Sequence, residues 1–305
     1  MPYIEARDGT ELYLKDWGDG PPVILIHGWP LSSDSWDDQA LALVEAGHRV
    51  IAYDRRGFGR SEQPAGGYDY DTFADDLADV IEAVDAQDEQ IALVGFSMGG
   101  GEIARYLSRH GSKGISKVAL IGSVAPYLLK TDDNPNGVPE ERFEAMREGI
   151  RTDRAAFFES FFKTFFGVGF IVHPVSDGQL NLAWTMAMQA GLLPTLAALD
   201  AFAETDFRPD LAAIDVPTLI IHGTSDKTVP IEPTGRAAAA AIPGARLIEY
   251  DGAPHGLFAT EKDRLSRDLI EFLGGTGTSF MLRDGERARE EGFADPLTAP
   301  TFEDR

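Results

Sequence analysis

The chain has 305 residues, of which 43% are hydrophobic and 25% are charged. It contains 27 Lys and Arg against 50 Asp and Glu, which gives a formal net charge of −23. This charge argues against nucleic acid or an anionic membrane as a partner, because both are bound through basic surfaces. The absence of cysteine excludes disulfides, a thiolate nucleophile and cysteine-ligated metal sites.

No targeting or membrane-spanning segment stands out in the sequence. Residues 1–10 lack both the basic and the apolar stretch of a signal peptide. The densest apolar runs, such as 23–26 and 219–221, are far shorter than the ~20 residues of a transmembrane helix. We therefore expect a cytoplasmic protein.

The first third of the chain alternates between strand-like and helix-like segments. Residues 3–6 and 11–17 are separated by Asp8-Gly9-Thr10, and this arrangement predicts a β-hairpin. Short apolar runs typical of buried strands follow at 23–26, 49–53, 91–94 and 118–121. Apolar strands that alternate with helices predict a parallel sheet covered on both faces.

The clearest helix pattern lies between the second and third of these buried strands. Apolar residues share one helical face there, namely Phe73, Leu77, Val80, Ile81 and Val84. The opposite face carries acidic residues that are expected to be solvated, namely Asp75, Asp76, Asp79 and Glu82. Asp71 is the expected N-cap.

Residues 126–212 break this rhythm and predict a helical cap inserted into the sheet domain. They contain three Phe-Phe pairs, at 157–158, 161–162 and 165–166, which form an aromatic stripe on one helix. We expect Phe158 and Phe162 of this stripe to wall a substrate pocket. The predicted organisation is a core in two parts, 1–125 and 213–273, the cap, and a C-terminal appendage over 274–305.

Gly95-Phe96-Ser97-Met98-Gly99 is a G-x-S-x-G motif between a predicted strand and a predicted helix. A serine at such a turn has a strained backbone and needs small neighbours, which Gly95 and Gly99 supply. The turn would lift the hydroxyl above the sheet at a helix N-terminus, where developing negative charge is favoured. Ser97 is therefore the candidate nucleophile.

Two further residues follow strands at the positions that a serine nucleophile requires. Asp226 comes directly after the apolar run 219–222, and His255 comes after the run 247–250. The order Ser…Asp…His, with each member beyond the carboxyl end of a strand, is that of the α/β-hydrolase triad. His255 would act as general acid and base, and Asp226 would orient it.

His27-Gly28-Trp29-Pro30 follows the strand at 23–26, where this fold places its oxyanion loop. We expect the backbone N–H groups of Trp29 and Met98 to hold the tetrahedral oxygen. His27 is expected to shape this loop by hydrogen bonding. Trp29, Pro30 and Phe96 are expected to line the substrate pocket.

Five stretches of the chain resemble a known group of α/β-hydrolases. They read LIHGWPLSSDSW, AYDRRGFGRSEQPAGGYDYDTFADDL, LVGFSMGGGEIARYLSRHG, KTDDNPNGVPEE and LIIHGTSDKTVPIEPTGRAA…YDGAPHGL. The resemblance, which runs from about residue 3 to 273, is to the cofactor-free haloperoxidases or perhydrolases and the related arylesterases and γ-lactamases. It implies a mostly parallel eight-stranded sheet flanked by helices, with an inserted helical cap. It also implies the Ser97, Asp226 and His255 triad and the Trp29 and Met98 oxyanion donors.

No motif in the sequence predicts a cofactor or a metal. Asp132-x-Asn134-x-Asn136-Gly137 imitates a calcium loop, but its twelfth position is Phe143 rather than glutamate. Gly57-Phe58-Gly59 lacks the third glycine of a dinucleotide fingerprint, and the six histidines lack metal-ligand spacing.

The leading hypothesis is a serine hydrolase of small esters whose acyl-enzyme is also attacked by hydrogen peroxide. Its partners would then be a small ester or carboxylic acid together with hydrogen peroxide. Amide or γ-lactam hydrolysis on the same triad is the alternative within enzymes, and a non-catalytic ligand receptor on the same scaffold is the alternative from another class. Turnover of a p-nitrophenyl ester separates an enzyme from a receptor. Assembly into a homo-oligomer is left open.

Overall fold

The structure, a computed structural model, describes residues 2–86 and 90–274. Within these residues, eight strands form one sheet in the order β1-β2-β4-β3-β5-β6-β7-β8. The strands are β1 (Tyr3–Glu5), β2 (Glu11–Trp17), β3 (Pro22–Ile26), β4 (Arg49–Tyr53), β5 (Ile91–Phe96), β6 (Ile115–Ile121), β7 (Thr218–Gly223) and β8 (Arg246–Tyr250). β2 pairs antiparallel with β1 and β4, whereas the remaining neighbours are parallel. The predicted hairpin and the mostly parallel sheet are thus present.

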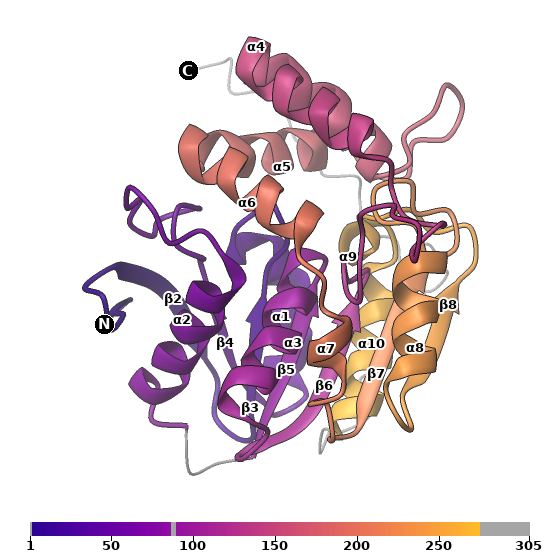
Figure 1. The fold of residues 1–305 in the computed structure, drawn as a ribbon. Coiled ribbons are helices and arrows are strands. Elements are labelled where there is room, and N and C mark those ends of the chain that lie inside the picture. Colours follow the sequence, from indigo (N-terminus) through magenta and orange to yellow (C-terminus); the bar gives the residue numbers. More distant parts are fainter. Residues whose placement is uncertain (1, 87–89, 275–305) are drawn as a thin grey trace, which may run out of the picture.

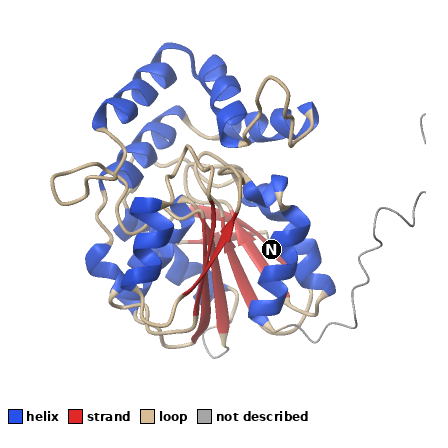
Figure 2. Cartoon of the chain, turned by 90° about the vertical axis from the view of Figure 1, so that its right-hand side faces the viewer, coloured by secondary structure: helices blue, strands red, loops and turns tan. Residues whose placement is uncertain are grey.

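Helices cover both faces of the sheet, which explains why its inner strands are apolar at every position. All residues of β3 and β5 are buried. The covering helices are α1 (Asp37–Glu45), α2 (Tyr70–Ala83), α3 (Met98–His110), α8 (Ala237–Ala241) and α10 (Lys262–Leu273), with short turns η1 (Ser33–Trp36), η2 (Glu232–Arg236) and α9 (Leu257–Thr260). Figure 2 shows the sheet between these two helical layers.

The N-terminus of α2 differs from the sequence-based expectation. Asp69, rather than Asp71, is the N-cap, and its carboxylate accepts a hydrogen bond from the N–H of Thr72 at 3.0 Å. Asp71 is the second residue of the helix, and its carboxylate forms ion pairs with Arg105 and Arg109 of α3. Both aspartates suit the first turn, so the sequence alone did not distinguish the cap from the ion-pair partner.

Asp76 of α2 is a second correction, because it is buried rather than solvated. Only 2% of this residue is exposed. Its carboxylate accepts hydrogen bonds from Nε and Nη2 of Arg56 at 2.6 and 2.5 Å. A buried carboxylate is tolerated when a guanidinium pairs with it in this bidentate way. Residue 56 is twenty positions away, so no local pattern indicated the pairing.

The chain between β6 and β7 forms four helices, α4 (Glu140–Phe165), α5 (Asp177–Gln189), α6 (Leu192–Glu204) and α7 (Arg208–Leu211). Figure 1 shows α4, α5 and α6 together above the sheet, on the side where the parallel strands end. α4 is interrupted at Asp153, whose backbone leaves the helical region and whose side chain accepts a hydrogen bond from the N–H of Ala156. The segment expected to be a cap therefore lies over the carboxyl edge of the sheet.

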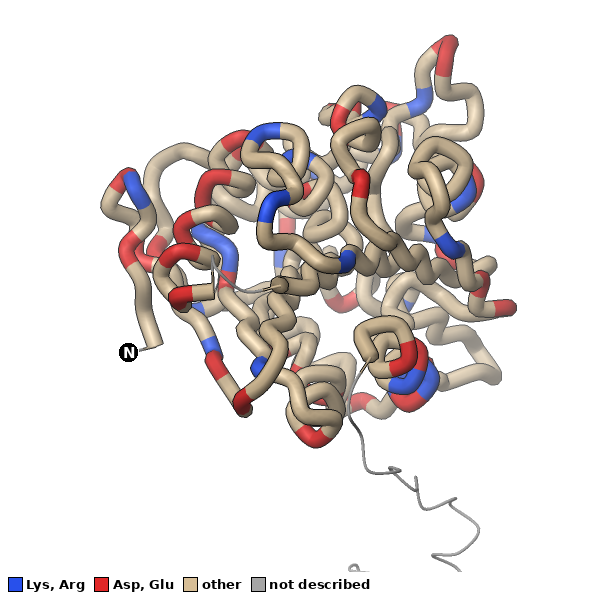
Figure 3. The backbone as a smooth tube through the Cα atoms, turned by 90° about the horizontal axis from the view of Figure 1, so that it is seen from below, with Lys and Arg blue, Asp and Glu red and all other residues tan. Residues whose placement is uncertain are grey.

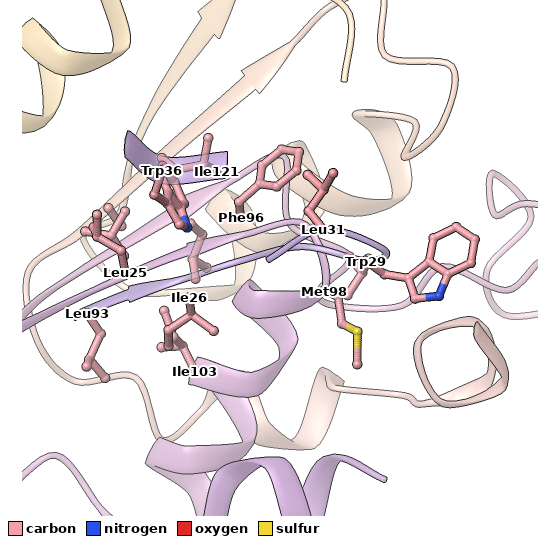
Figure 4. Close-up of a cluster of buried hydrophobic side chains, with 14 of the residues drawn as sticks. Leu25, Ile26, Trp29, Leu31, Trp36, Leu93, Phe96, Met98, Ile103 and Ile121 are labelled. Carbon is pink, nitrogen blue, oxygen red and sulfur yellow. The ribbon is translucent and has the colours of Figure 1, made fainter. Parts of the chain in front are cut away.

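The core below the cap reaches up to the end of β5. Figure 4 shows Phe96 among buried side chains that include Trp36 and Ile121. The rings of Phe96 and Trp36 meet edge to face at 6.3 Å between centroids. Phe96 is 1% exposed, so the residue before the candidate nucleophile is anchored in the core.

Charged residues are spread over the chain. Figure 3 shows acidic and basic positions interspersed along it, without one continuous basic stretch in the residues drawn.

Within 2–86 and 90–274, no single helix has both the length and the apolar character needed to cross a membrane. α5 and α6 reach those limits only when they are joined across a bend of 100°. The appendage predicted from residue 274 onward lies, after Gly274, outside the described residues.

Candidate active site

Ser97 occupies the sharp turn between β5 and α3. Its backbone has φ 53° and ψ −116°, a conformation that non-glycine residues rarely adopt. The flanking glycines make this turn sterically possible. A Cβ at Gly95 would lie 2.5 Å from the carbonyl oxygen of Gly99, and a Cβ at Gly99 would lie 2.5 Å from that of Ile26. The G-x-S-x-G spacing thus reflects two close backbone approaches around one strained serine.

The structure brings the three predicted triad residues into one hydrogen-bonded chain. His255 Nδ1 lies 2.5 Å from Asp226 Oδ2, and His255 Nε2 lies 2.9 Å from Ser97 Oγ. Because a carboxylate only accepts, Nδ1 carries the proton and Nε2 accepts the serine hydroxyl. All three side chains are buried, although residues 97 and 255 are 158 positions apart. This is the geometry of an activated serine with an oriented base.

The environment of Asp226 keeps it ionised. Its Oδ1 accepts the backbone N–H groups of Thr228 at 2.9 Å and Val229 at 2.7 Å. Its Oδ2 lies 3.4 Å from His222 Nε2, which also donates to the carbonyl of Val229 at 2.9 Å. Burial raises the pKa of Asp226, but attraction to His255 and hydrogen bonding from His222 outweigh it and hold that pKa well below its usual range. Asp226 is therefore negatively charged at neutral pH and can stabilise a cationic His255.

Two phenylalanine rings orient the imidazole of His255. Phe96 lies against it at 4.8 Å between centroids with a 37° tilt, and Phe165 of α4 meets it edge to face at 4.9 Å. Phe96 therefore packs beside the base instead of lining the substrate pocket as expected from the sequence. Because Phe165 lies on α4, the helices between β6 and β7 contact the base directly.

The loop after β3 lies against the nucleophile. A Cβ at Gly28 would be 3.0 Å from Ser97 Cβ and 2.7 Å from the Phe96 ring, so only glycine fits. Met98 is the first residue of α3, and its N–H has no partner in the helix. Within the described residues, the N–H groups of Trp29 and Met98 make no hydrogen bond. Two unpaired donors beside a serine are what an oxyanion hole requires.

His27 shapes this loop. Its Nδ1 donates to the carbonyl of Gly28 at 2.9 Å, and its Nε2 accepts the N–H of Arg55 at 2.9 Å. Arg55 also donates to the carbonyl of His27 and pairs with the buried Glu102 of α3. Burial and the positive charge of Arg55 lower the pKa of His27 to about 3. His27 therefore stays neutral and is part of the loop's framework.

This lowered pKa predicts acid sensitivity. An unfolded histidine titrates at its ordinary value of 6.5, so the folded state binds fewer protons below that pH. The stability that His27 contributes is fully present above pH 6.5 and is lost as the pH falls toward 3. We expect the free energy of unfolding to drop by about 2 kcal/mol more between pH 7 and pH 5 than it does in His27→Gln. Urea denaturation of both proteins measures this, and equal losses would contradict it.

A cavity of about 250 Å³ opens beside Ser97 and His255. Its walls are mainly apolar and come largely from α4 and α6, with Phe143, Met146, Phe157, Phe161 and Phe202 among them. Trp29 also lines the cavity, where its ring contacts those of Phe161 and Phe202, and its Nε1 donates to the carbonyl of Thr195 at 2.9 Å. An apolar cavity with few polar groups next to a reactive serine suits a small organic substrate.

The members of the aromatic stripe that line this cavity differ from those expected from the sequence. Phe157 and Phe161 line it, whereas Phe158 and Phe162 are 0% and 1% exposed and pack into the core. The two members of each Phe-Phe pair point in different directions from the helix. The sequence alone does not show which of these directions faces the cavity. Pro30 is also absent from the lining within the described residues; it is buried, and its bond to Trp29 is cis.

Sequence reasoning missed several residues at this site. Thr228 and Val229 hold Asp226 through backbone groups, which leave no side-chain signal. His222 is the next-to-last residue of β7, and its spacing of four from Asp226 was the only available hint. Arg142 lines the cavity from the first turn of α4, where no motif marks it.

The described residues contain no group of three or more His, Cys, Asp or Glu arranged to hold a metal ion. The reactive group is the hydroxyl of Ser97, with the imidazole of His255 and an ionised aspartate behind it.

Known proteins of similar sequence match most of this chain. The chain is 45% identical to a non-heme chloroperoxidase from Kitasatospora aureofaciens over 90% of this chain and 99% of that protein. It is 39% identical to a bifunctional esterase/perhydrolase from Acinetobacter calcoaceticus, again over 90% and 99%. Each match covers nearly the full length of the relative.

Solved structures and a family model agree with these relatives. A bromoperoxidase from Bacillus anthracis matches with a TM-score of 0.85 and 46% identity, covering 89% of this chain and 99% of that one. An esterase from Exiguobacterium antarcticum matches with a TM-score of 0.84 and 33% identity over 89% and 98%. The family model described as the alpha/beta hydrolase fold matches residues 21–262. With its serine turn, its eight-stranded sheet and its inserted helices, the chain belongs to the α/β-hydrolase fold family.

Proposed function

We propose that this protein is a serine hydrolase of small carboxylic esters that also acts as a perhydrolase. The proposal rests on one observation. Ser97, His255 and Asp226 form a continuous hydrogen-bonded chain, and Ser97 lines a small apolar cavity. The names of the relatives, which include non-heme chloroperoxidases and an esterase/perhydrolase, support the same activity.

The first half of the reaction acylates Ser97. Its Oγ attacks the ester carbonyl while His255 Nε2 takes the hydroxyl proton, and Asp226 stabilises the imidazolium. The N–H groups of Trp29 and Met98 would donate to the oxyanion that forms. The tetrahedral intermediate then expels the alcohol, which receives the proton from His255. An acyl ester on Ser97 remains.

The second half of the reaction releases the acyl group. Water or hydrogen peroxide gives its proton to His255 and attacks the acyl carbonyl, and Ser97 Oγ leaves with that proton. Water yields the carboxylic acid, and hydrogen peroxide yields the peracid. A free carboxylic acid enters the same route by acylating Ser97 with loss of water. The peracid then oxidises bromide outside the triad, being reduced to the acid as hypobromous acid forms.

Bromination of a diketone dye tests this proposal. We expect bromination to require hydrogen peroxide, bromide and a short carboxylic acid together, because the peracid is the oxidant. A chelator should leave the rate unchanged, and Ser97→Ala should abolish it. Bromination that persists without the carboxylic acid, or that a chelator stops, would exclude the peracid route.

We also propose that residues 126–212 act as the cap of this enzyme, with α4 forming the substrate wall. The contacts of Phe157 and Phe161 with the cavity, and of Phe165 with His255, support this role. A cap that touches both substrate and base would set the size of the acyl group, so short acyl chains are the expected substrates.

A further inference from the structure

Arg142 is a cationic side chain in the wall of an otherwise apolar cavity. Among the described residues that line this cavity, the remaining polarity comes from hydroxyl groups, Ser97 and His255, and no Asp or Glu takes part. Arg142 lies in the first turn of α4 and is exposed. A guanidinium in the same cavity as Ser97 is placed to meet an anionic part of a substrate.

One contact holds the guanidinium of Arg142 close to the triad. Its Nη2 donates a hydrogen bond to the backbone carbonyl of Lys227. The next residue, Thr228, lines the cavity and donates its N–H to Asp226. This contact holds the positive charge of Arg142 at the loop that follows Asp226. It uses only Nη2 and leaves the other N–H groups of the guanidinium unengaged.

Arg142 has no acidic partner among the described residues. The sequence contains 50 acidic and 27 basic residues, so carboxylates outnumber cations nearly two to one. Arg147, further along the same helix, pairs with four carboxylates, those of Glu140, Glu144, Asp200 and Glu204. The guanidinium that faces the cavity is thus left unneutralised, while one nearby on α4 is surrounded by acids.

We propose that Arg142 binds a second carboxylate on the substrate, so that the enzyme prefers esters or acids with a carboxylate a few carbons from the reacting carbonyl. This inference rests on the proposed function, since it assigns the substrate class of that site. A guanidinium binds a carboxylate through two parallel charge-assisted hydrogen bonds, which an amide does not reproduce. The net charge of −23 opposes anions at long range, but salt screens that repulsion beyond ~8 Å. The local charge of Arg142 then decides the preference.

A pair of isosteric esters tests this preference. Mono-p-nitrophenyl glutarate carries the second carboxylate, and the p-nitrophenyl ester of glutaramic acid carries a neutral amide in its place. The measured quantity is the ratio of kcat/KM for the two esters after subtraction of uncatalysed hydrolysis. Because both esters are hydrolysed by the same protein sample, general losses of activity cancel in this ratio.

We expect the wild-type protein to favour the glutarate ester and Arg142→Gln to lower the ratio by roughly tenfold. Arg142→Lys keeps the charge and should keep most of the preference. Arg151→Gln is the matched control, because Arg151 is an exposed arginine of the same helix outside the cavity wall. Its ratio should equal that of the wild type.

The outcomes separate this inference from the proposed function. If the wild type hydrolyses both esters and Arg142→Gln leaves the ratio unchanged, Arg142 only ties the cap to residue 227 and the carboxylate site is wrong. If the wild type hydrolyses neither ester, nor p-nitrophenyl acetate, the proposed function itself fails.

Discussion

Replacing Ser97 with alanine is expected to lower kcat for p-nitrophenyl acetate by about 10⁴-fold to 10⁶-fold. The reason is that Ser97 Oγ forms the bond to the acyl group. Among the described residues, it is also the only hydroxyl that is hydrogen-bonded to His255 Nε2, at 2.9 Å. His255→Ala should lose a similar factor, and the double variant should lose little more, because nucleophile and base act as one unit. Initial rates of p-nitrophenol release measure all three.

Circular dichroism and thermal melting provide the control for these variants. The alanine variants should remain folded, and the cavity left by the buried His255 side chain should lower the melting temperature of that variant. A folded Ser97→Ala protein that keeps even a tenth of the wild-type rate would contradict the assignment of the nucleophile. Additive losses in the double variant would show that His255 acts independently of Ser97.

Asp226→Asn is expected to lower kcat by about 10⁴-fold, although it changes one atom. The N–H groups of Thr228 and Val229 point at Oδ1, so they would hold the amide oxygen at that position. The amide NH₂ would then face His255 Nδ1 and donate to it. His255 would carry its proton on Nε2 and could no longer accept the proton of Ser97.

The matched control for this variant is Asp251→Asn. Asp251 is exposed in the loop after β8 and accepts a hydrogen bond only from Thr224 Oγ1, at 3.3 Å, among the described residues. This variant should keep the wild-type kcat. Near-normal activity of Asp226→Asn would mean that the tautomer of His255 is set by other contacts.

The sheet, the serine turn and the triad could be predicted because each leaves a local trace. Buried parallel strands are apolar at every position, as in 91–96, and a strained serine needs glycines at 95 and 99. Residues 226 and 255 each follow a strand, and parallel strands end at one edge of a sheet. The common edge places these residues together even though they are far apart in the sequence.

The remaining features depend on contacts between distant segments. Asp76 is buried because Arg56 reaches it, and Phe157 rather than Phe158 meets the cavity because of how α4 is rotated on the core. Arg142 acquires its position from the carbonyl of Lys227 on another segment. Helical periodicity constrains which residues share a face, but not which neighbour that face meets.

The central claim is that one acyl-enzyme on Ser97 is shared by water and hydrogen peroxide. The most direct measurement is the ratio of peracetate to acetate formed at one peroxide concentration from two esters, p-nitrophenyl acetate and phenyl acetate, with Ser97→Ala as the blank. A common acyl group retains no trace of the alcohol that left, so this account predicts the same ratio for both esters. A ratio that changes with the leaving group would contradict it, because peroxide would then be attacking the ester itself.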